Sequence, residues 1–113
     1  MAFKTATFEG GIALISPSGS LIGGDETVKL RQAVSGFVDR GYDKLIIDLS
    51  AVTYLNSTAL GVLVSAHTTY AKKGWQIKLT GMNKSIDSIF VITKLTLVFD
   101  VCESREEAMK SFS

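Results

Sequence analysis

A short apolar run near the middle of the chain does most to restrict its fold. Residues 44–49 read Lys-Leu-Ile-Ile-Asp-Leu, with large aliphatic side chains at successive positions rather than at alternate ones. Such a run is typical of a strand that is buried on both faces, as strands are in a parallel sheet covered by helices. The chain is therefore expected to alternate strands with helices.

Helical periodicity is present on both sides of this strand. Before it, apolar residues recur every three or four positions between 28 and 38, and we expect Asp25 to cap this helix and Gly41 to end it. After it, residues 57–73 are expected to form a second helix that ends at Gly74. The side chains expected on the inner side of the second helix are Leu60, Leu63, Val64, His67, Tyr70 and Ala71.

Shorter elements complete the expected order. Residues 3–8 and 12–15 should form an opening hairpin, and residues 17–24, with one proline and three glycines, a loop. The remaining segments expected to be regular are strands at 75–79 and 97–101, a helix at 83–94, and a terminal helix begun by a capping box of Ser104 and Glu107.

The predicted order is thus ββαβαβαβα. Repeated strand–helix–strand units need right-handed crossovers and place the central strands parallel in one sheet. We therefore predict an α/β fold with a mostly parallel central sheet of about five strands and four helices. No linker, internal repeat or low-complexity tract interrupts the sequence, so residues 1–113 are expected to be a single domain.

The composition argues against several functional classes. The formal net charge of +1 argues against general electrostatic binding to nucleic acid or anionic lipid. The one cysteine, Cys102, cannot form an internal disulfide, which fits a reducing compartment. No apolar stretch approaches the roughly 18 residues of a membrane span, and the N-terminus lacks a signal-peptide core. We expect a cytoplasmic protein with no membrane insertion.

No catalytic or metal-binding pattern is legible either. His67 is the only histidine, without a Ser-His-Asp arrangement or metal-ligand spacing around it, and we expect it to pack against the core. Gly10-Gly11 and Gly23-Gly24 match no phosphate-binding loop and are read as turns. We therefore expect no enzyme activity, no cofactor and no metal site, and we expect Asp48 to accept hydrogen bonds from the loop that follows it.

The most informative segment leads from the central strand into the second helix. Asn56 or Ser57 can cap this helix, and a helix N-terminus stabilises an anion placed on it. A phosphate on Ser57 would be tolerated there but would repel a docked partner, while Ser57, Gly61, Ser65, Thr68 and Lys72 share one outward stripe. A plain helix cap explains the same residues, and spacing alone does not separate the two interpretations.

At this point the chain resembles the STAS domain, the fold shared by bacterial anti-sigma factor antagonists and the cytoplasmic tails of sulfate transporters. The resemblance spans nearly all 113 residues. It rests on Gly19-Ser20-Leu21, on Asp48-Leu49-Ser50, and above all on residues 54–61, Tyr-Leu-Asn-Ser-Thr-Ala-Leu-Gly, which are similar to the family signature Asp-Ser-[Ser/Thr]-Gly-Leu-Gly. It implies a right-handed β/α superhelix.

The resemblance also implies a function. Ser57 would be phosphorylated by an anti-sigma serine kinase, the unphosphorylated form would bind that kinase and release a sigma factor, and a phosphatase would restore it. The residues that the resemblance and the outward stripe place on the partner surface are Ser20, Leu21, Gly23, Asn56, Thr58, Gly61, Ser65 and Thr68.

Two departures from the signature keep alternatives open. Asn56 stands where the family has aspartate, and Ala59, whose methyl group would face an approaching partner, stands where it has glycine. The Asn56 change favours a second hypothesis, a STAS interaction subunit of a transporter or other regulatory complex that is never phosphorylated. A small-molecule or nucleotide-binding domain is a third hypothesis, without a phosphate-binding loop to support it. The oligomeric state stays open.

Overall fold

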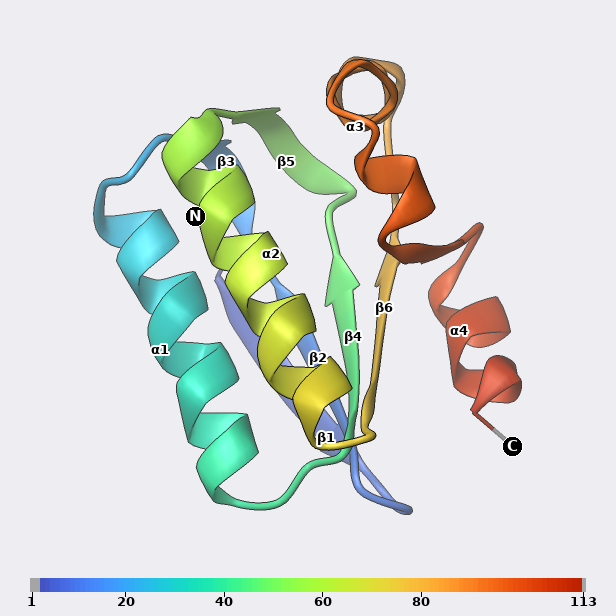
Figure 1. Ribbon diagram of the computed structural model, residues 1–113. Coiled ribbons are helices and arrows are strands. Elements are labelled where there is room, and N and C mark those ends of the chain that lie inside the picture. Colours follow the sequence, from blue (N-terminus) through green and yellow to red (C-terminus); the bar gives the residue numbers. More distant parts are fainter. Residues whose placement is uncertain (1–2, 113) are drawn as a thin grey trace.

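The computed structural model describes residues 3–112 (Figure 1). In chain order its elements are β1 (Lys4–Phe8), β2 (Ile12–Ser16), β3 (Ser18–Leu21), α1 (Asp25–Asp39), β4 (Lys44–Asp48), β5 (Ala51–Leu55), α2 (Ser57–Lys72), β6 (Gln76–Thr80), α3 (Lys84–Ile92), the 3₁₀ turn η1 (Leu95–Leu97), β7 (Asp100–Cys102) and α4 (Arg105–Ser111).

The main sheet has five strands in the order β1-β2-β4-β6-β7. The first pair is antiparallel, and β2, β4, β6 and β7 are parallel to one another. Helices α1 and α2 cover one face of this sheet and α4 covers the other (Figure 1). The predicted α/β fold, with a mostly parallel five-stranded sheet and four helices, is confirmed.

Strand β4 lies at the centre of the sheet and is buried on both faces, as its apolar run predicts. Leu45 and Ile47 belong to the large core beneath α1 and α2, whereas Ile46 packs in the smaller cluster beneath α4. All three side chains are at most 1% exposed. Burying a side chain of this size contributes about 1.5–3 kcal/mol, so the central strand anchors both layers.

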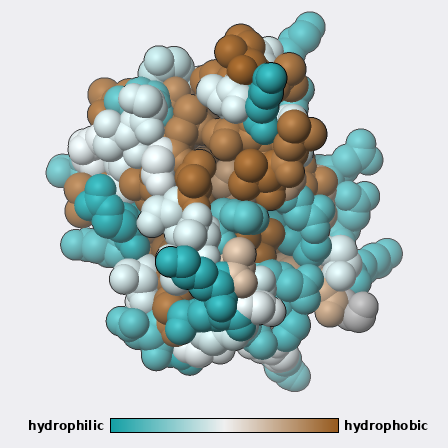
Figure 2. Space-filling view, viewed as in Figure 1, coloured by the Kyte–Doolittle hydropathy of each residue, from teal (hydrophilic) through white to brown (hydrophobic). Residues whose placement is uncertain are grey.

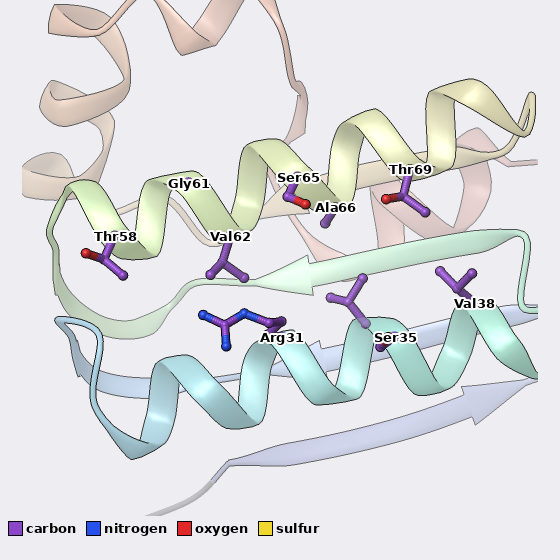
Figure 3. Close-up of a pocket in the computed structure, with 10 residues that line it drawn as sticks. Arg31, Ser35, Val38, Thr58, Gly61, Val62, Ser65, Ala66 and Thr69 are labelled. Carbon is purple, nitrogen blue, oxygen red and sulfur yellow. The ribbon is translucent and has the colours of Figure 1, made fainter.

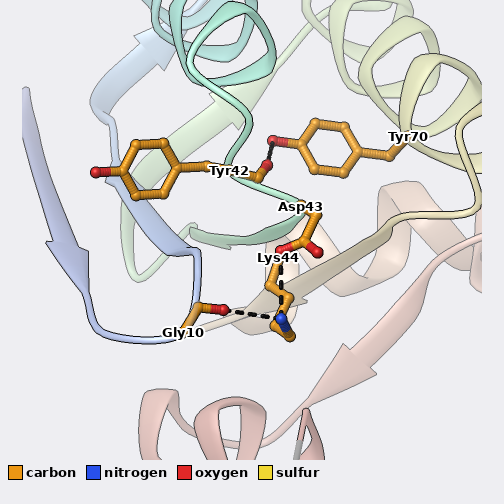
Figure 4. Close-up of polar contacts among 5 residues, drawn as sticks. All are labelled: Gly10, Tyr42, Asp43, Lys44 and Tyr70. Atoms are coloured by element: carbon orange, nitrogen blue, oxygen red, sulfur yellow. Dashed lines mark hydrogen bonds and ion pairs between the residues drawn. The ribbon is translucent and has the colours of Figure 1, made fainter.

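The end of the sheet where β4 begins is closed by polar contacts (Figure 4). The Tyr70 hydroxyl donates to the Tyr42 carbonyl at 2.8 Å, and the Lys44 ammonium donates to the Gly10 carbonyl at 2.8 Å and to Asp43 at 3.2 Å. Burial, and then the charge of Asp43, raise the pKa of Tyr70 to about 12. These contacts hold the C-terminal end of α2 against the sheet, at the opposite end of the helix from Ser57.

Two strands were missed by the sequence prediction. Residues 17–24 were expected to be a loop, but Ser18–Leu21 form β3, which pairs in parallel with β5 in a separate two-stranded sheet. Strand β3 is short and contains Gly19 at φ +78°, where the register with β5 shifts. A glycine in so short a strand weakens the pattern by which strands are recognised.

The boundaries of one helix and one strand differ from expectation. Asp25 does not cap α1: Gly24 is the N-cap residue and Asp25 is the first helical residue, where its carboxylate faces the positive end of the helix dipole. The 97–101 strand begins later, at Asp100, because the residues before it form η1. At α4 the predicted capping is confirmed, since the Ser104 hydroxyl accepts from the Glu107 N–H at 3.0 Å.

The buried side of α2 is turned slightly from the predicted one. Leu63 and Tyr70 are buried as expected, but Ala71 is exposed, and Leu60, Val64 and His67 are only partly buried. The residues that fill the core from this helix are Ala59, Val62, Leu63, Ala66 and Tyr70. The helix packs against α1 as well as the sheet, and this second contact pulls Val62 and Ala66 inward.

Apolar side chains also gather at the surface over α3 and the turn that follows it (Figure 2). The large exposed ones in this region are Val91, Ile92, Leu97 and Val98. Within residues 3–112, no helix has both the length and the apolar character that crossing a membrane requires.

Candidate functional site

Strand β5 delivers the chain to the first turn of α2, where the candidate site lies. Leu55, the last residue of the strand, is buried, and the Asn56 N–H donates to the Leu21 carbonyl at 3.1 Å. The Asn56 side-chain oxygen then accepts from the Ala59 N–H at 3.0 Å. Asn56 is therefore the N-cap of α2, and of the two residues considered for that role, Ser57 is free of it.

Ser57 is the first residue of α2 and is exposed. Its hydroxyl makes no hydrogen bond with any residue in the range 3–112. The N–H groups of Ser57 and Thr58 have no carbonyl in a preceding helical turn, so this end of the helix presents free donors and partial positive charge. The site thus combines an accessible hydroxyl with a local environment that stabilises an anion.

The loop between β3 and α1 lies beside this first turn. Gly23 has φ +92°, and a Cβ atom added to it would lie 3.4 Å from the Thr58 methyl carbon, which places the loop backbone in contact with α2. The Gly23 N–H donates to the buried Thr27 hydroxyl at 2.9 Å. Ile22, at 57% exposed, extends into solvent next to this contact.

Most of the sequence-predicted partner residues are exposed in the structure, with one correction. Leu21 is fully buried, so its side chain cannot touch a docked partner, and its contribution is the carbonyl that binds Asn56. Asn56 is partly buried by its capping role. The predicted residues that are exposed are Ser20, Gly23, Thr58, Gly61, Ser65 and Thr68.

Ala59 also differs from its expected role. Its methyl group was expected to face an approaching partner, but Ala59 is 0% exposed and belongs to the main core. The backbone of this residue, rather than its side chain, serves the site, because its N–H is the donor to the Asn56 cap.

A groove between α1 and α2 extends the site along the molecule (Figure 3). Its volume is about 350 Å³. Residues of α1 line one wall and residues of α2 the other, and the full set is Arg31, Val34, Ser35, Val38, Thr58, Gly61, Val62, Ser65, Ala66 and Thr69. The helical spacing marks the α2 wall in the sequence, but no sequence signal identifies which face of α1 lies across from it.

Asp48 ends the central strand and organises the loop before β5. Its carboxylate accepts from the Ser50 N–H at 2.9 Å, as predicted, and from the Arg105 guanidinium at 2.5 Å. Burial acts to raise the pKa of Asp48, but the Ser50 hydrogen bond and the Arg105 charge outweigh it and lower this pKa below its ordinary value. Asp48 is therefore a negatively charged residue with a structural role: it fixes the loop that leads into β5.

The remaining reactive side chains have packing roles in the structure. His67 is partly buried and meets the Phe99 ring edge-to-face at 5.3 Å. Cys102 is buried, and this burial raises the pKa of its thiol, which lowers its nucleophilicity. No group of His, Cys, Asp or Glu side chains in the described part of the chain is arranged to hold a metal ion.

Comparison with known proteins finds a matching family model and similar relatives. A family model described as the STAS domain matches residues 4–108. The anti-sigma-B factor antagonist of Bacillus subtilis (strain 168) is 32% identical over 77 residues, which cover 68% of this chain and 70% of the relative. A Thermotoga maritima protein named as an anti-sigma factor antagonist is 27% identical over 74 residues, 66% of each chain, so the match spans just under two thirds of that relative.

Solved structures share the architecture over almost the whole chain. The crystal structure of an anti-sigma factor antagonist from Thermotoga maritima has a TM-score of 0.88 at 21% identity and covers 96% of this chain and 92% of its own. The Bacillus cell fate determinant SpoIIAA in its phosphorylated form has a TM-score of 0.78 at 15% identity, with coverage of 99% and 100%. At these identities the likeness establishes the fold.

Proposed function

This chain belongs to the STAS domain family, and from that premise we propose that it is an anti-sigma factor antagonist switched by phosphorylation of Ser57. In the unphosphorylated form it binds an anti-sigma serine kinase and so releases a sigma factor. Phosphorylation ends that binding, and a phosphatase restores it. The names of the Bacillus and Thermotoga relatives support the antagonist function.

The observation that carries the proposal is that one residue, Asn56, caps α2, while its neighbour Ser57 has a hydroxyl that is free within the described chain. Asn56 caps α2, so the Ser57 hydroxyl is exposed and has no structural bond within residues 3–112. A residue that caps a helix cannot be modified without loss of the cap. Ser57 is free of this constraint, and so the fold tolerates both its states.

The proposed reaction is a phosphoryl transfer from ATP. A bond forms between the Ser57 oxygen and the γ-phosphorus, the bond from that phosphorus to the ADP oxygen breaks, and the hydroxyl proton passes to a base of the kinase. The product carries about −1.5 to −2 charges at neutral pH. At the N-terminus of α2 this charge is favourable for the antagonist itself.

The same charge opposes a docked partner. Near Ser57, Ile22 of the β3–α1 loop and Tyr54 of β5 are 57% and 51% exposed and offer apolar surface for contact. A partner that buries these side chains would also enclose the phosphate, and enclosing an unpaired charge is costly. The switch therefore acts on the complex rather than on the fold.

We also propose that residues 1–113 function as one STAS domain in the cytoplasm, where the kinase and ATP are present. The family match over residues 4–108 supports the single domain.

One observation favours the second candidate function, a STAS interaction subunit that is never phosphorylated. Asn56 occupies the signature position at which the family carries aspartate, and it lies directly before the proposed acceptor. A kinase that reads the carboxylate there would find an amide. Stable association with a transporter ATPase subunit, with no phosphate gained, is the outcome that this candidate requires.

The test is phosphorylation by the cognate kinase with ATP, followed by intact mass measurement. We expect the wild-type chain to gain one phosphate, Ser57→Ala to gain none, and Ser65→Ala, one exposed serine further along α2, to behave like wild type. Ser57→Asp should bind the kinase more weakly than wild type. Equal binding of Ser57→Asp and wild type would reject the charge argument.

A further inference from the structure

The groove between α1 and α2 has features that the proposed switch does not use. Its floor is formed by the apolar residues Val34, Val62 and Ala66, whose exposed fractions are 7%, 8% and 4%. The α2 side of the groove is open at Gly61, which has no side chain and has no heavy atom within 4 Å of its Cβ position. The rim carries hydroxyl groups from Ser35, Thr58, Ser65 and Thr69, which can donate or accept hydrogen bonds.

One charged residue lines this groove, and it is unpaired. Arg31 makes no ion pair or hydrogen bond with any residue in the described range 3–112, and no carboxylate lines the groove. Lys29, on the same helix, is by contrast paired with Glu26 at 3.6 Å. Figure 3 shows the Arg31 side chain extended in the groove between the two helices, in the half that contains Thr58.

We propose that this groove binds an acidic segment of a partner protein, with Arg31 as the residue that recognises its carboxylate. A guanidinium presents donors in a planar fork that matches a carboxylate, and an apolar floor strengthens such a pair by excluding water. The free N–H groups at the start of α2 add positive potential at the same end.

The distribution of charge fixes how the segment lies. The end of the groove near Val38 and Thr69 has no charged lining residue, so the acidic side chain sits at the Arg31 end and small or apolar side chains follow toward Val38. The α2 side of the groove, from Thr58 to Thr69, is about 16 Å long, at about 1.5 Å of helix per residue. That length accepts about five residues of extended chain or three turns of helix.

This proposal goes beyond the phosphorylation switch. It assigns the chemistry of a partner segment along the groove, which adjoins the Ser57 site and shares Thr58, Gly61 and Ser65 with the predicted partner surface. The proposal holds whether or not Ser57 is phosphorylated.

The experiment is photo-crosslinking in the native cells, with a diazirine side chain placed at Ser35 in the groove. The matched control places the same group at Gln32, which is exposed on the same helix but does not line the groove. We expect capture from Ser35 and not from Gln32, and mass spectrometry should place the crosslink on a segment that contains Asp or Glu.

Charge reversal then tests the role of Arg31. Arg31→Glu, with folding checked by circular dichroism, should weaken capture by more than about tenfold. Changing the acidic residue of the captured segment to arginine should restore it. Four outcomes would overturn the proposal: no capture from Ser35, capture of a second copy of this chain, a captured segment without a carboxylate, or capture that Arg31→Glu leaves unchanged.

A Ser57→Asp background separates the two proposals. Capture at the groove should persist in the Ser57→Asp chain, whereas binding to the kinase should be weakened. Loss of capture with Ser57→Asp would overturn the proposal that the groove binds its segment whatever the state of Ser57. A failure of the phosphorylation assay with capture retained would reject the switch and leave the groove proposal standing.

Discussion

The side-chain oxygen of Asn56 accepts a hydrogen bond from the N–H of Ala59, and these are the two positions at which the chain departs from the STAS signature. The two departures are thus the acceptor and the donor of one helix cap. Both residues act on the inner side of the helix start, since Ala59 is fully buried and Asn56 partly so. The outer side, with Ser57 and Thr58, keeps the polar residues of the family pattern.

We predict that removing this cap destabilises the protein. Asn56→Ala should lower the free energy of unfolding by about 1 kcal/mol, because the Ala59 N–H loses its acceptor. Ser57→Ala should change it by less than about 0.5 kcal/mol, since its exposed hydroxyl makes no bond in the described chain. Urea denaturation measures both, and equal losses in the two variants would contradict the assignment of the cap to Asn56.

We predict that a phosphate at Ser57 stabilises the isolated protein slightly. Phosphoserine incorporated at position 57 should raise the free energy of unfolding by about 0.3–1 kcal/mol at low salt, through the positive end of α2. The gain should shrink when the salt concentration is raised, because the site is exposed. Denaturation at low and high ionic strength is the measurement, and a destabilising phosphate would show that the helix start does not accept the charge.

The two adjacent glycines of the β3–α1 loop should differ in their tolerance of a side chain. Gly23→Ala places a Cβ at φ +92°, next to Thr58, and should cost about 1–2 kcal/mol. Gly24 has φ −85° and no heavy atom within 4 Å of its Cβ position, so Gly24→Ala should stay within about 0.5 kcal/mol of wild type. Thermal unfolding of the pair checks this, and similar melting temperatures would argue against the described loop geometry.

The ion pair between Asp48 and Arg105 should make stability depend on pH. The folded-state pKa of Asp48 lies below the ordinary value for aspartate. The contribution of this carboxylate to stability is therefore present at neutral pH and is lost as pH falls through the folded-state pKa. Arg105→Ala should cost about 1–3 kcal/mol at pH 7, a range that reflects the half-exposed Arg105 side chain.

The gap in stability between wild type and Arg105→Ala should therefore narrow as pH falls through the folded-state pKa of Asp48, because protonation removes the charge that Arg105 pairs with. Urea denaturation at pH 7 and at about pH 2 measures this gap, and Arg105→Lys serves as the control that keeps the charge. A gap of the same size at both pH values would mean that Arg105 stabilises the protein through packing and its hydrogen bond to the Ser16 hydroxyl at 3.0 Å, and not through the charge of Asp48.

The sequence was sufficient for the central sheet and the helices because their patterns are strong. The unbroken aliphatic run of β4 and the long periodicity of α1 and α2 each predict one structure. Strands β3 and β5 were missed for a physical reason: they pair only with each other, and neither has a clear strand pattern. Strand β3 has four residues, one of them a glycine, and burial along β5 does not alternate from one residue to the next. Each strand is paired with a segment 33 or 34 residues away in the sequence, as Ser18 is with Ala51 and Leu21 with Leu55.

The candidate site was predicted in part. Ser57, Gly61 and Ser65 were placed on an exposed face of α2, and all three are exposed. Leu21 was misjudged because a motif shows which residues recur and not which way each side chain faces, and in β3 it faces the core. Arg31 was missed because the groove depends on how α1 packs beside α2, a tertiary contact without a local signature.

The two-stranded β3–β5 sheet lies outside the five-stranded one, and its exposed residues Ser20, Thr53 and Tyr54 border the helix start that carries Ser57. Substitutions there leave the aliphatic interior untouched. Duplicated copies of such a gene could therefore diverge in the partner that each recognises while every copy still folds. For the proposed switch, this arrangement would separate the choice of binding partner from the stability of the fold.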